Sequence, residues 1–274
     1  MKKILIQLDS DPLPSAFDCI AAYDAGADVV QSYGGVSPAG VRGLLLGAVF
    51  TRGIPDLKSI AVWIGGSDVE AGERILAEAR GAFFGPFRVS LMLDSNGCNT
   101  TASTAAAKLA RQADLRGRSA VVLGPGPVGV RVAALLAGEG CRVLLASIPA
   151  QLLGKKFDAA LAERTMESAR KTADAFRSGP SAGSGGSIEV ADLKSPGEIE
   201  GILRAASILA AAGPAGVRMV PQTLWQSLPD LRYMIDFNLT EPLGIEGIRP
   251  GDDFAGYGSV YALGALAVGN PKMK

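Results

Sequence analysis

The chain has 274 residues, 48% of them hydrophobic, which allows two ordinary domains with a substantial buried core. Its 27 basic residues balance 27 acidic ones without a block of like charge, so the composition excludes the electrostatic footprint of a nucleic-acid-binding protein and favours a small-molecule partner. Histidine is absent, which excludes Ser-His-Asp triads, Cys-His pairs and histidine-ligated metal sites.

Two features set the expected location. The longest apolar stretches, such as residues 43–50, are too short to cross a bilayer, and the amino-terminal stretch lacks a signal-cleavage site. We therefore expect a cytoplasmic protein without a membrane partner. The three cysteines, Cys19, Cys98 and Cys141, are odd in number and widely spaced, which favours reduced structural thiols over disulfides or a metal site.

The first hundred residues predict an α/β domain, because short runs typical of strands alternate with helical patterns. The strands are expected at 4–8, 59–64 and 87–93, and the helices at 15–25 and 69–80. A further helix at 100–112 is expected to join this domain to the next.

A second unit is predicted for residues 101–255. Its strands are expected at 120–123, 142–145, 188–190, 207–210 and 232–235, with helices between them. This alternation is typical of a Rossmann-like, doubly wound, mostly parallel sheet. The predicted fold class is therefore α/β with two lobes.

Three further expectations concern the second half of the chain. Residues 178–187 are rich in serine and glycine, which predicts a mobile surface loop. Residues 261–269 are small and apolar, which predicts a close-packed helix, and we expect the segment 256–274 to return to the first lobe. Glycine- and alanine-rich helices with exposed apolar surface indicate a homo-oligomer.

The most informative motif is Gly124-Pro-Gly126-Pro127-Val128-Gly129, which lies between a predicted strand and a predicted helix. That context is what a dinucleotide site requires. Gly124 permits the tight turn, Gly126 lets the backbone approach a pyrophosphate, and Gly129 lets the helix lie close to the sheet. The phosphates would bind the free N–H groups of the helix. The alternative is a glycine turn that binds nothing.

The end of the next strand indicates which nicotinamide nucleotide is bound. An acidic residue at this place binds the ribose of NAD, whereas a basic residue nearby accommodates the phosphate of NADP. Here Ser147 replaces the carboxylate, and Lys155 and Lys156 follow. NADP is therefore favoured, with NAD possible. The alternative is that both lysines are solvated residues at a helix start.

Polar residues also follow other predicted strands or flank tight turns, which is where open α/β sheets bind ligands. The residues singled out in this way are Asp9, Asp11, Phe17 and Asp18; Asn96, Asn99, Thr100 and Thr101; and Asp236 and Asn238.

Together these stretches resemble the methylene-tetrahydromethanopterin dehydrogenase family of methylotrophic bacteria, including its methylene-tetrahydrofolate-using relatives. The resemblance covers nearly the whole chain, and its specific motifs lie at residues 94–97, 212–216 and 264–270. It implies an amino-terminal pterin-binding lobe and a Rossmann lobe. The implied reaction is hydride transfer from methylene-tetrahydromethanopterin to NAD(P), giving the methenyl cation. Two ring nitrogens delocalise that charge, so no metal or covalent nucleophile is required.

The resemblance also assigns roles. Lys272 falls on the family's active-site lysine, which implies an orienting and electrostatic role; the alternative is a solvated lysine. The chain ends two residues later, where family members continue with a helical segment, so we expect Lys272 to be loosely held. Residues 149–156 lack the arginine that some members carry there, and Ala212 and Gly213 are placed with the nucleotide-binding residues.

For the pterin, Asp9, Asp11 and Asp18 are expected to accept its amino and ring N–H groups, and Phe17 to stack on its face. The structural alternatives are that Asp11 or Ser15 caps the next helix and that Phe17 belongs to the core.

The other polar residues have similar alternatives. The residues Asn96, Asn99, Thr100 and Thr101 would donate to the substrate, although Asn99 or Thr100 also suits a helix N-cap. Asp236 and Asn238 would line the nicotinamide side or form an Asx turn.

The sequence therefore predicts an NAD(P)-dependent methylene-tetrahydromethanopterin dehydrogenase. The alternatives are a bifunctional or tetrahydrofolate-specific enzyme, a non-catalytic NADP- or pterin-binding protein, and a different dehydrogenase such as a shikimate-type enzyme.

Overall fold

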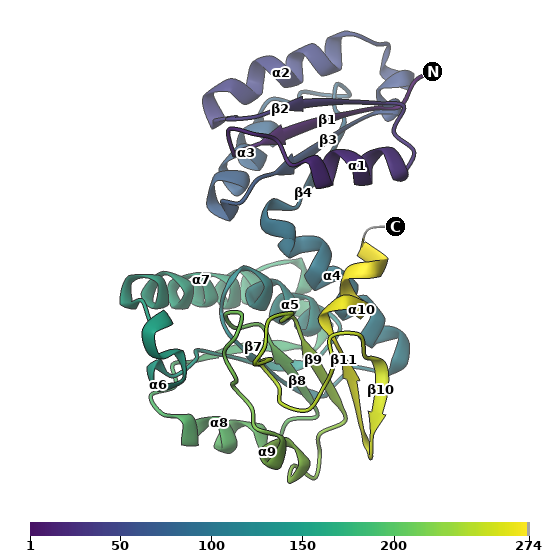
Figure 1. Ribbon diagram of the computed structural model, residues 1–274. Helices are drawn as coiled ribbons and strands as arrows, with labels where there is room; N and C mark the ends of the chain where they lie inside the picture. Colours follow the sequence, from purple (N-terminus) through teal and green to yellow (C-terminus); the bar gives the residue numbers. More distant parts are fainter. Residues whose placement is uncertain (273–274) are drawn as a thin grey trace. The chain divides into compact units, whose positions relative to one another are not determined.

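The computed structural model describes residues 1–272, without the side chains of Ala182 and of residues 270–272. The chain divides into two compact α/β units, residues 1–100 and 101–272 (Figure 1). Each unit contains one sheet of mostly parallel strands, which confirms the predicted fold class. No helix in the described part of the chain is long and apolar enough to span a membrane.

The first unit contains a four-stranded parallel sheet with the order β2-β1-β3-β4. Its elements are β1 (Ile4–Asp9), α1 (Ala16–Asp24), β2 (Val29–Tyr33), α2 (Pro38–Phe50), η1 (Ile54–Ser59), β3 (Ile60–Gly65), α3 (Val69–Gly81), β4 (Ser90–Leu93) and η2 (Ser95–Gly97), followed by α4 (Cys98–Gln112), which continues into the second unit.

The two faces of this sheet differ because successive side chains of a strand point to opposite faces. Ile6 and Leu8 of β1 are packed in one hydrophobic core with residues of β3, α2 and α3. Gln7 and Asp9 point to the other face, where the Gln7 amide donates to the Ser15 carbonyl at the start of α1. Polar groups therefore gather on the α1 face.

Sequence patterns missed two elements here, β2 and α2. β2 is an edge strand with three exposed residues, so it lacks the apolar run of a buried strand. α2 carries Gly40, Gly43 and Gly47 on its exposed side, and these glycines obscure its helical pattern.

The second unit contains a seven-stranded sheet with the order β10-β11-β9-β8-β5-β6-β7. Its elements are β5 (Ser119–Leu123), α5 (Pro127–Gly138), β6 (Arg142–Ala146), α6 (Ala150–Leu153), η3 (Gly154–Lys156), α7 (Ala159–Ser178), η4 (Pro180–Ser184), β7 (Ser187–Ala191), α8 (Pro196–Leu203), β8 (Ile208–Ala211), α9 (Gln222–Gln226), β9 (Tyr233–Asp236), β10 (Asp253–Tyr257), β11 (Val260–Leu263) and α10 (Ala265–Lys272).

Six of these strands, β7-β6-β5-β8-β9-β11, are parallel and follow the 3-2-1-4-5-6 order of a dinucleotide-binding sheet. Residues of α4, α5, α7 and α10 form the core on one face, and residues of α8 and α9 form the core on the other. The strand order reverses between β5 and β8, which is where such sheets bind ligands.

The carboxyl-terminal segment differs from our expectation. Residues 261–263, which we expected to begin a helix, belong to strand β11, and the expected helix starts at Ala265 as α10. The segment 256–272 groups with the second unit, whereas we expected it to return to the first. β11 pairs in parallel with β9, and all of its residues except Tyr261 are buried. Lys108 of α4 fastens this segment by binding the Asp253 carboxylate at 2.7 Å and the Ala267 carbonyl at 3.2 Å.

The stretch 178–187, which we expected to be a surface loop, contains a short helix and packs against α5. It forms the 3-10 helix η4, and the Ser184 hydroxyl donates to the Ala137 carbonyl at the end of α5 over 3.0 Å. A side chain on Gly186 would collide with the same carbonyl, so glycine permits this close packing.

Candidate functional site

In the first unit, the carboxylate of Asp9 holds the loop between β1 and α1 in place. One oxygen accepts the N–H of Asp11 and the other the N–H of Ser15, both at 2.9 Å. Asp9 is 1% exposed. Its carboxylate is therefore committed to shaping the loop after β1, and its predicted contact with a ligand has no support in this geometry.

Asp11 links the loop after β1 to the loop after β3. Its two oxygens accept the N–H of Ser67 at 3.0 Å and the Ser67 hydroxyl at 2.8 Å. Asp11 therefore does not cap α1. Ser15 does so, because its hydroxyl accepts the N–H of Asp18 at 3.2 Å.

Asp18 lies on α1 over the polar face of the sheet. A Cβ atom on Gly65 would lie 3.0 Å from Asp18 Oδ2, 3.5 Å from Trp63 Nε1 and 3.6 Å from Asp9 Oδ2, so these groups surround the space that the glycine leaves. Burial raises the pKa of Asp18, and the charges of Asp94 and Asp9 add to the rise, while the donors of Trp63 and Ser15 oppose it. No acceptor in the described residues lies at full bonding distance from Trp63 Nε1.

Phe17 is 56% exposed on α1, so the alternative that it belongs to the core is wrong. α1 contains no buried residue at all. The aromatic ring beside Asp18 is therefore presented on the outside of the helix, where a planar ligand could stack on it.

The residues 94–101 mainly build the start of α4. Asp94 accepts the N–H of Thr100 at 2.8 Å and the Thr100 hydroxyl at 2.7 Å. The Asn99 amide donates to the Leu93 carbonyl at 2.8 Å. The helix is thus capped by Asp94, and neither Asn99 nor Thr100 is its N-cap. Asn96 has a positive φ of 54° and donates its N–H to Gly66, and Thr101 begins the second unit.

Sequence reasoning left three residues of this face out of the site: Gln7, Trp63 and Ser67. Gln7 is 1% exposed and accepts from the Ser32 hydroxyl at 2.6 Å. The available signal was the two-residue period of β1 and β3, which places Gln7, Asp9, Trp63 and Gly65 on one face.

In the second unit, Gly124 and Gly129 meet at the switch point of the sheet. Gly124 has a φ of 102°, and a Cβ atom on it would lie 2.7 Å from the Ala212 carbonyl. A Cβ atom on Gly129 would lie 1.9 Å from the Gly124 oxygen. Both glycines therefore perform the turn and the close packing that the motif predicts.

Gly126 is different, because no atom lies within 4 Å of the Cβ that it lacks. It is the N-cap of α5 and makes no side-chain capping bond. Pro127 has no N–H, and the N–H groups of Val128 and Gly129 are in the first turn, where a helix supplies no acceptor. The space that a side chain on Gly126 would fill is therefore empty, and an anion at this place could bind the N–H groups of the first turn.

The loop after β8 forms the other wall of this site. Ala212 donates its N–H to Leu123 at the end of β5 over 2.8 Å. A side chain on Gly213 would collide with Ile148 and Met219, so both of these approach the bare backbone. Ile148, which sequence reasoning did not single out, lies directly after Ser147.

The region after β6 differs from the expectation on which the choice of NADP depended. Ser147 was expected to remove negative charge from this position, but its hydroxyl donates to the Asp192 carboxylate at 3.0 Å. Asp192 follows β7, the neighbouring strand. A carboxylate is therefore present, supplied from a strand that the motif does not include.

The two lysines of this region differ in their surroundings. Lys156 donates to the carbonyls of Ala215 and Gly216 in the loop after β8. Lys155 is exposed in the 3-10 helix η3, which is compatible with the alternative that it is a solvated lysine. Lys156 is therefore partly committed to holding η3 against the β8 loop.

Asp236 and Asn238 form a compact turn after β9. The Asp236 carboxylate accepts the N–H of Ile245 at 2.7 Å and both the N–H and the side-chain amide of Asn238, at 2.9 and 3.1 Å. Burial raises the pKa of Asp236, while these donors oppose the rise. The geometry favours the Asx-turn alternative for this pair.

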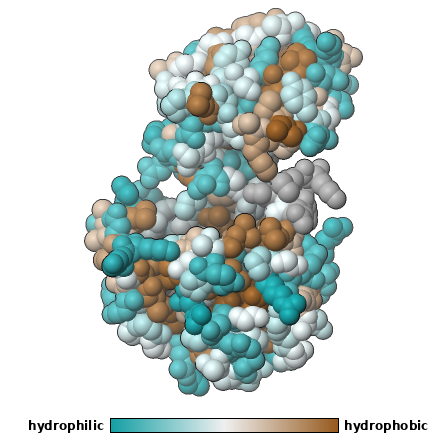
Figure 2. Space-filling model, viewed as in Figure 1, coloured by the Kyte–Doolittle hydropathy of each residue, from teal (hydrophilic) through white to brown (hydrophobic). Residues whose placement is uncertain are grey.

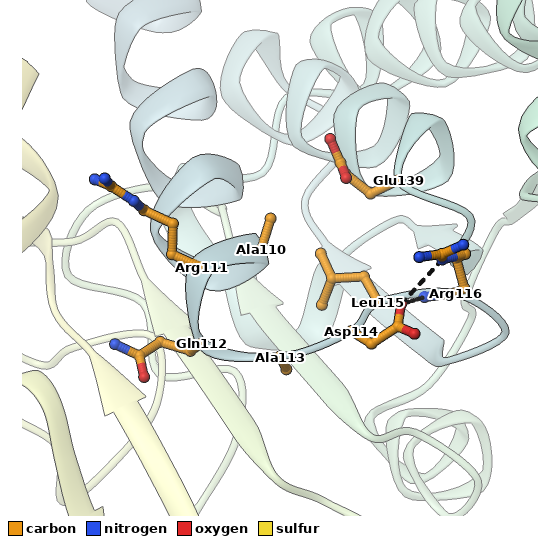
Figure 3. Close-up of a pocket in the computed structure, with 8 residues that line it drawn as sticks. All are labelled: Ala110, Arg111, Gln112, Ala113, Asp114, Leu115, Arg116 and Glu139. Carbon is orange, nitrogen blue, oxygen red and sulfur yellow. Dashed lines mark hydrogen bonds and ion pairs between the residues drawn. The ribbon is translucent and has the colours of Figure 1, made fainter.

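The Lys272 side chain lies outside the described residues. A depression of about 490 Å³ is lined by Ala110–Arg116 and Glu139, which Figure 3 shows as sticks. Residues 110–116 precede β5, and Glu139 lies between α5 and β6. The depression is therefore at the amino-terminal ends of these strands, whereas the glycine loop is at the carboxyl-terminal end of β5. In the described part of the chain, no group of three or more acidic or cysteine side chains is placed to hold a metal ion.

Comparisons with known proteins agree with this arrangement. Residues 16–96 match the family described as methylene-tetrahydromethanopterin dehydrogenase, N-terminal. The chain is 41% identical over 276 residues to the bifunctional protein MdtA of Methylorubrum extorquens, and the match covers 100% of this chain and 89% of that protein. The chain belongs to the methylene-tetrahydromethanopterin dehydrogenase family. Another relative in this family, the NAD(P)-dependent methylenetetrahydromethanopterin dehydrogenase of the same organism, is 28% identical over 94% of this chain and 84% of its own length.

Solved structures show the same fold in more distant proteins. Ornithine carbamoyltransferase from Pyrococcus furiosus has a TM-score of 0.55 at 10% identity, over 99% of this chain and 82% of its own. N-acetyl-L-ornithine transcarbamylase has a TM-score of 0.54 at 13% identity, over 99% of this chain and 86% of its own. At identities this low, the similarity shows a shared fold and gives no information about the reaction.

Proposed function

We propose that this member of the dehydrogenase family oxidises methylene-tetrahydromethanopterin to the methenyl form by transferring a hydride to NAD or NADP. The observation that supports the proposal most directly is the open backbone at Gly126, at the switch point of a sheet with the dinucleotide-binding strand order. No packing contact of the described residues requires a glycine at position 126, whereas a pyrophosphate that lies against the backbone does.

The geometry of the second unit supports the nucleotide-binding role. Pyrophosphate oxygens would accept from the N–H groups of Val128 and Gly129, and the positive end of α5 would stabilise their charge. Ile148, which packs against Gly213, offers an apolar side chain to the adenosine half of the nucleotide. When bound, the nicotinamide ring supplies the hydride acceptor.

Recognition of the pterin is assigned to the first unit, with Asp18 as the acceptor for its N–H groups and Phe17 as the stacking partner. Asp18 is half-buried and Phe17 exposed, and they are adjacent on α1. Asp9 and Asp11 then act through the loops, which they hold in place, and do not contact the substrate. Asn96, Asn99, Thr100 and Thr101 remain proposed contributors to the same site.

Lys272 is proposed as the catalytic lysine that orients the reacting ring and tunes its electrostatics. The reaction leaves a cation stabilised by two nitrogens, so it demands positioning more than acid-base chemistry. The absence of histidine is compatible with this demand.

A second carrier, methylene-tetrahydrofolate, is the close alternative. The relative that is 41% identical is named a bifunctional protein, which supports testing more than one activity. The two carriers share the reacting ring, so a site that positions one carbon unit can also position the other.

The test is the formation of reduced nicotinamide with each carrier and each nucleotide. Turnover with methylene-tetrahydromethanopterin supports the proposal, and turnover only with methylene-tetrahydrofolate supports the alternative carrier. If the protein binds a nicotinamide nucleotide but turns over neither carrier, it is a non-catalytic binding protein or a different dehydrogenase. Turnover of hydroxy acids would identify the latter.

Self-association is also part of the proposal. A hollow of about 460 Å³ lies beside the edge strand β2, where Gly43 and Gly47 of α2 leave space next to Tyr33 and Leu44. On the face shown in Figure 2, apolar residues interrupt the polar surface of both units. A second copy of the chain would cover such surface. Light scattering that shows a monomer at working concentration would contradict this.

A further inference from the structure

The segment after β7 carries an acidic and a basic side chain, Asp192 and Lys194, beside the end of β6, where a Rossmann sheet contacts the adenosine ribose. β6 and β7 pair in parallel, with Ala146 opposite Ala191, so Ser147 and Asp192 are the next residues of neighbouring strands. The Ser147 hydroxyl donates to Asp192 at 3.0 Å and accepts the N–H of Leu193 at 2.7 Å. Ser147 is 9% exposed, so this buried hydroxyl fixes the orientation of the carboxylate.

The other oxygen of Asp192 forms an ion pair with Lys194. The hydrogen bond from Lys194 lowers the pKa of Asp192, and the Ser147 hydroxyl and the charge of Arg170 contribute to the same shift. The carboxylate is therefore ionised at neutral pH. The Lys194 side chain is 74% exposed and that of Asp192 44%, so both remain accessible to a ligand from solvent.

We propose that the Asp192–Lys194 pair determines the choice between NAD and NADP in this protein. The proposal rests on the nucleotide site proposed above and adds its specificity. The carboxylate accepts from the ribose 2′-hydroxyl of NAD, as an acidic residue after the second strand does in other dinucleotide sites. The ammonium group turns from the carboxylate to the 2′-phosphate of NADP.

The energetics permit this exchange. An exposed ion pair contributes little to stability, so the lysine can leave the carboxylate at small cost. In NADP the lysine offsets the repulsion between Asp192 and the phosphate. Lys156 cannot take over this role without giving up its bonds to the β8 loop. The pair therefore allows the site to use both nucleotides, because Asp192 favours NAD and Lys194 favours NADP.

The test is calorimetric titration of the full-length protein with NAD and with NADP, for the wild type and for Asp192→Asn and Lys194→Ala. Both positions are on the surface, so both variants are expected to fold. The ratio of NADP affinity to NAD affinity should rise about tenfold in Asp192→Asn and fall about tenfold in Lys194→Ala, as expected for one charge acting over a few ångströms near the surface.

Two controls separate this effect from a general change of charge. Asp174→Asn removes the acidic member of an exposed ion pair with Arg177, on α7, and should leave the ratio unchanged. Lys155→Ala removes the exposed lysine of η3. If Lys155→Ala lowers the ratio and Lys194→Ala does not, the 2′-phosphate is read by η3 and the proposal is wrong.

Failure of the proposal is distinct from failure of the proposed function. If both nucleotides bind and neither variant changes the ratio by more than about twofold, the Asp192–Lys194 pair does not read the ribose. If the wild type binds neither nucleotide, the nucleotide site itself is refuted.

Discussion

The carbonyl oxygen of Gly124 and the α carbon of Gly129 approach so closely that a Cβ atom on Gly129 would lie 1.9 Å from that oxygen. The obstacle is backbone, so it cannot rotate away. We predict that Gly129→Ala destabilises the protein by about 1–3 kcal/mol, the usual cost of overpacking a core. Chemical denaturation measures this, and an unchanged unfolding midpoint would contradict the packing described for α5.

Gly126→Ala should lower nucleotide affinity without lowering stability. Its φ of −73° suits alanine and nothing lies within 4 Å of the added carbon, so stability should be unchanged. The methyl group would occupy the approach to the α5 N–H groups, and nucleotide affinity should fall at least about tenfold. Gly138→Ala at the other end of α5 is the matched control, because its added carbon also meets no atom and should not affect binding. Full affinity in Gly126→Ala would place the nucleotide elsewhere.

The roles of these glycines could be predicted from the sequence because they are local. A turn with positive φ and a helix start are determined by a few adjacent residues, and the flanking strand and helix set their orientation. The same reasoning failed at Ser147, since the carboxylate that Ser147 binds belongs to Asp192, 45 residues further along the chain. The pairing of β6 with β7 brings them together, and no local pattern encodes it.

A similar limit applies in the first unit. Asp9, Asp11 and Asp18 occur within ten residues and look equivalent in the sequence, yet the structure gives them different tasks. The carboxylate of Asp9 accepts two backbone N–H groups, and that of Asp11 accepts the N–H and the hydroxyl of Ser67. Asp18 instead lies on α1 beside Phe17. Alternation along β1 predicts which face Asp9 occupies, but the partners of each carboxylate depend on loops brought together by the fold.

Asp18→Asn tests this division of labour. We predict that pterin affinity falls about tenfold, because an amide offers only one acceptor oxygen where the carboxylate offers two. Asp11→Asn is the comparison, since it should weaken the Ser67 contacts and lower stability. Equal pterin affinity in Asp18→Asn and the wild type would remove Asp18 from the site.

The raised pKa of Asp18 should make both stability and pterin affinity depend on pH. Burial raises the pKa of Asp18, so its ionised form is disfavoured in the folded state. Its contribution to stability is therefore present below the unfolded pKa and is lost as the pH rises through the folded pKa. Pterin affinity should change in the other direction, falling as the pH drops through the raised pKa and the acceptor is protonated. Titration of pterin binding against pH, with Asp18→Asn lacking this transition, measures the effect.

Cys141 should be inert in the folded protein. Burial raises the pKa of its thiol to about 11, and its Sγ lies 3.3 Å from the Leu115 carbonyl. At pH 8 only about one thiol in a thousand is ionised, and the thiolate is the reactive form. Alkylation mapped by mass spectrometry should label the half-buried Cys19 first and Cys141 only after unfolding. Equal labelling rates for the two in the folded state would contradict the packing around β5 and β6.

Lys272 carries the catalytic part of the proposal. We predict that Lys272→Ala lowers kcat about a hundredfold, the scale for loss of an electrostatic group at a reacting centre, while nucleotide affinity is unchanged. Lys272→Arg should restore part of kcat if the positive charge matters. Unchanged turnover in Lys272→Ala would show that the lysine is only a solvated residue.

The most direct test of the account is the absorbance of reduced nicotinamide formed by the wild-type chain. Methylene-tetrahydromethanopterin and methylene-tetrahydrofolate would each be offered with NAD and with NADP. We predict turnover of methylene-tetrahydromethanopterin with both nucleotides. A protein that binds nucleotide at the Gly126 backbone yet turns over neither carrier would contradict the proposed dehydrogenase activity.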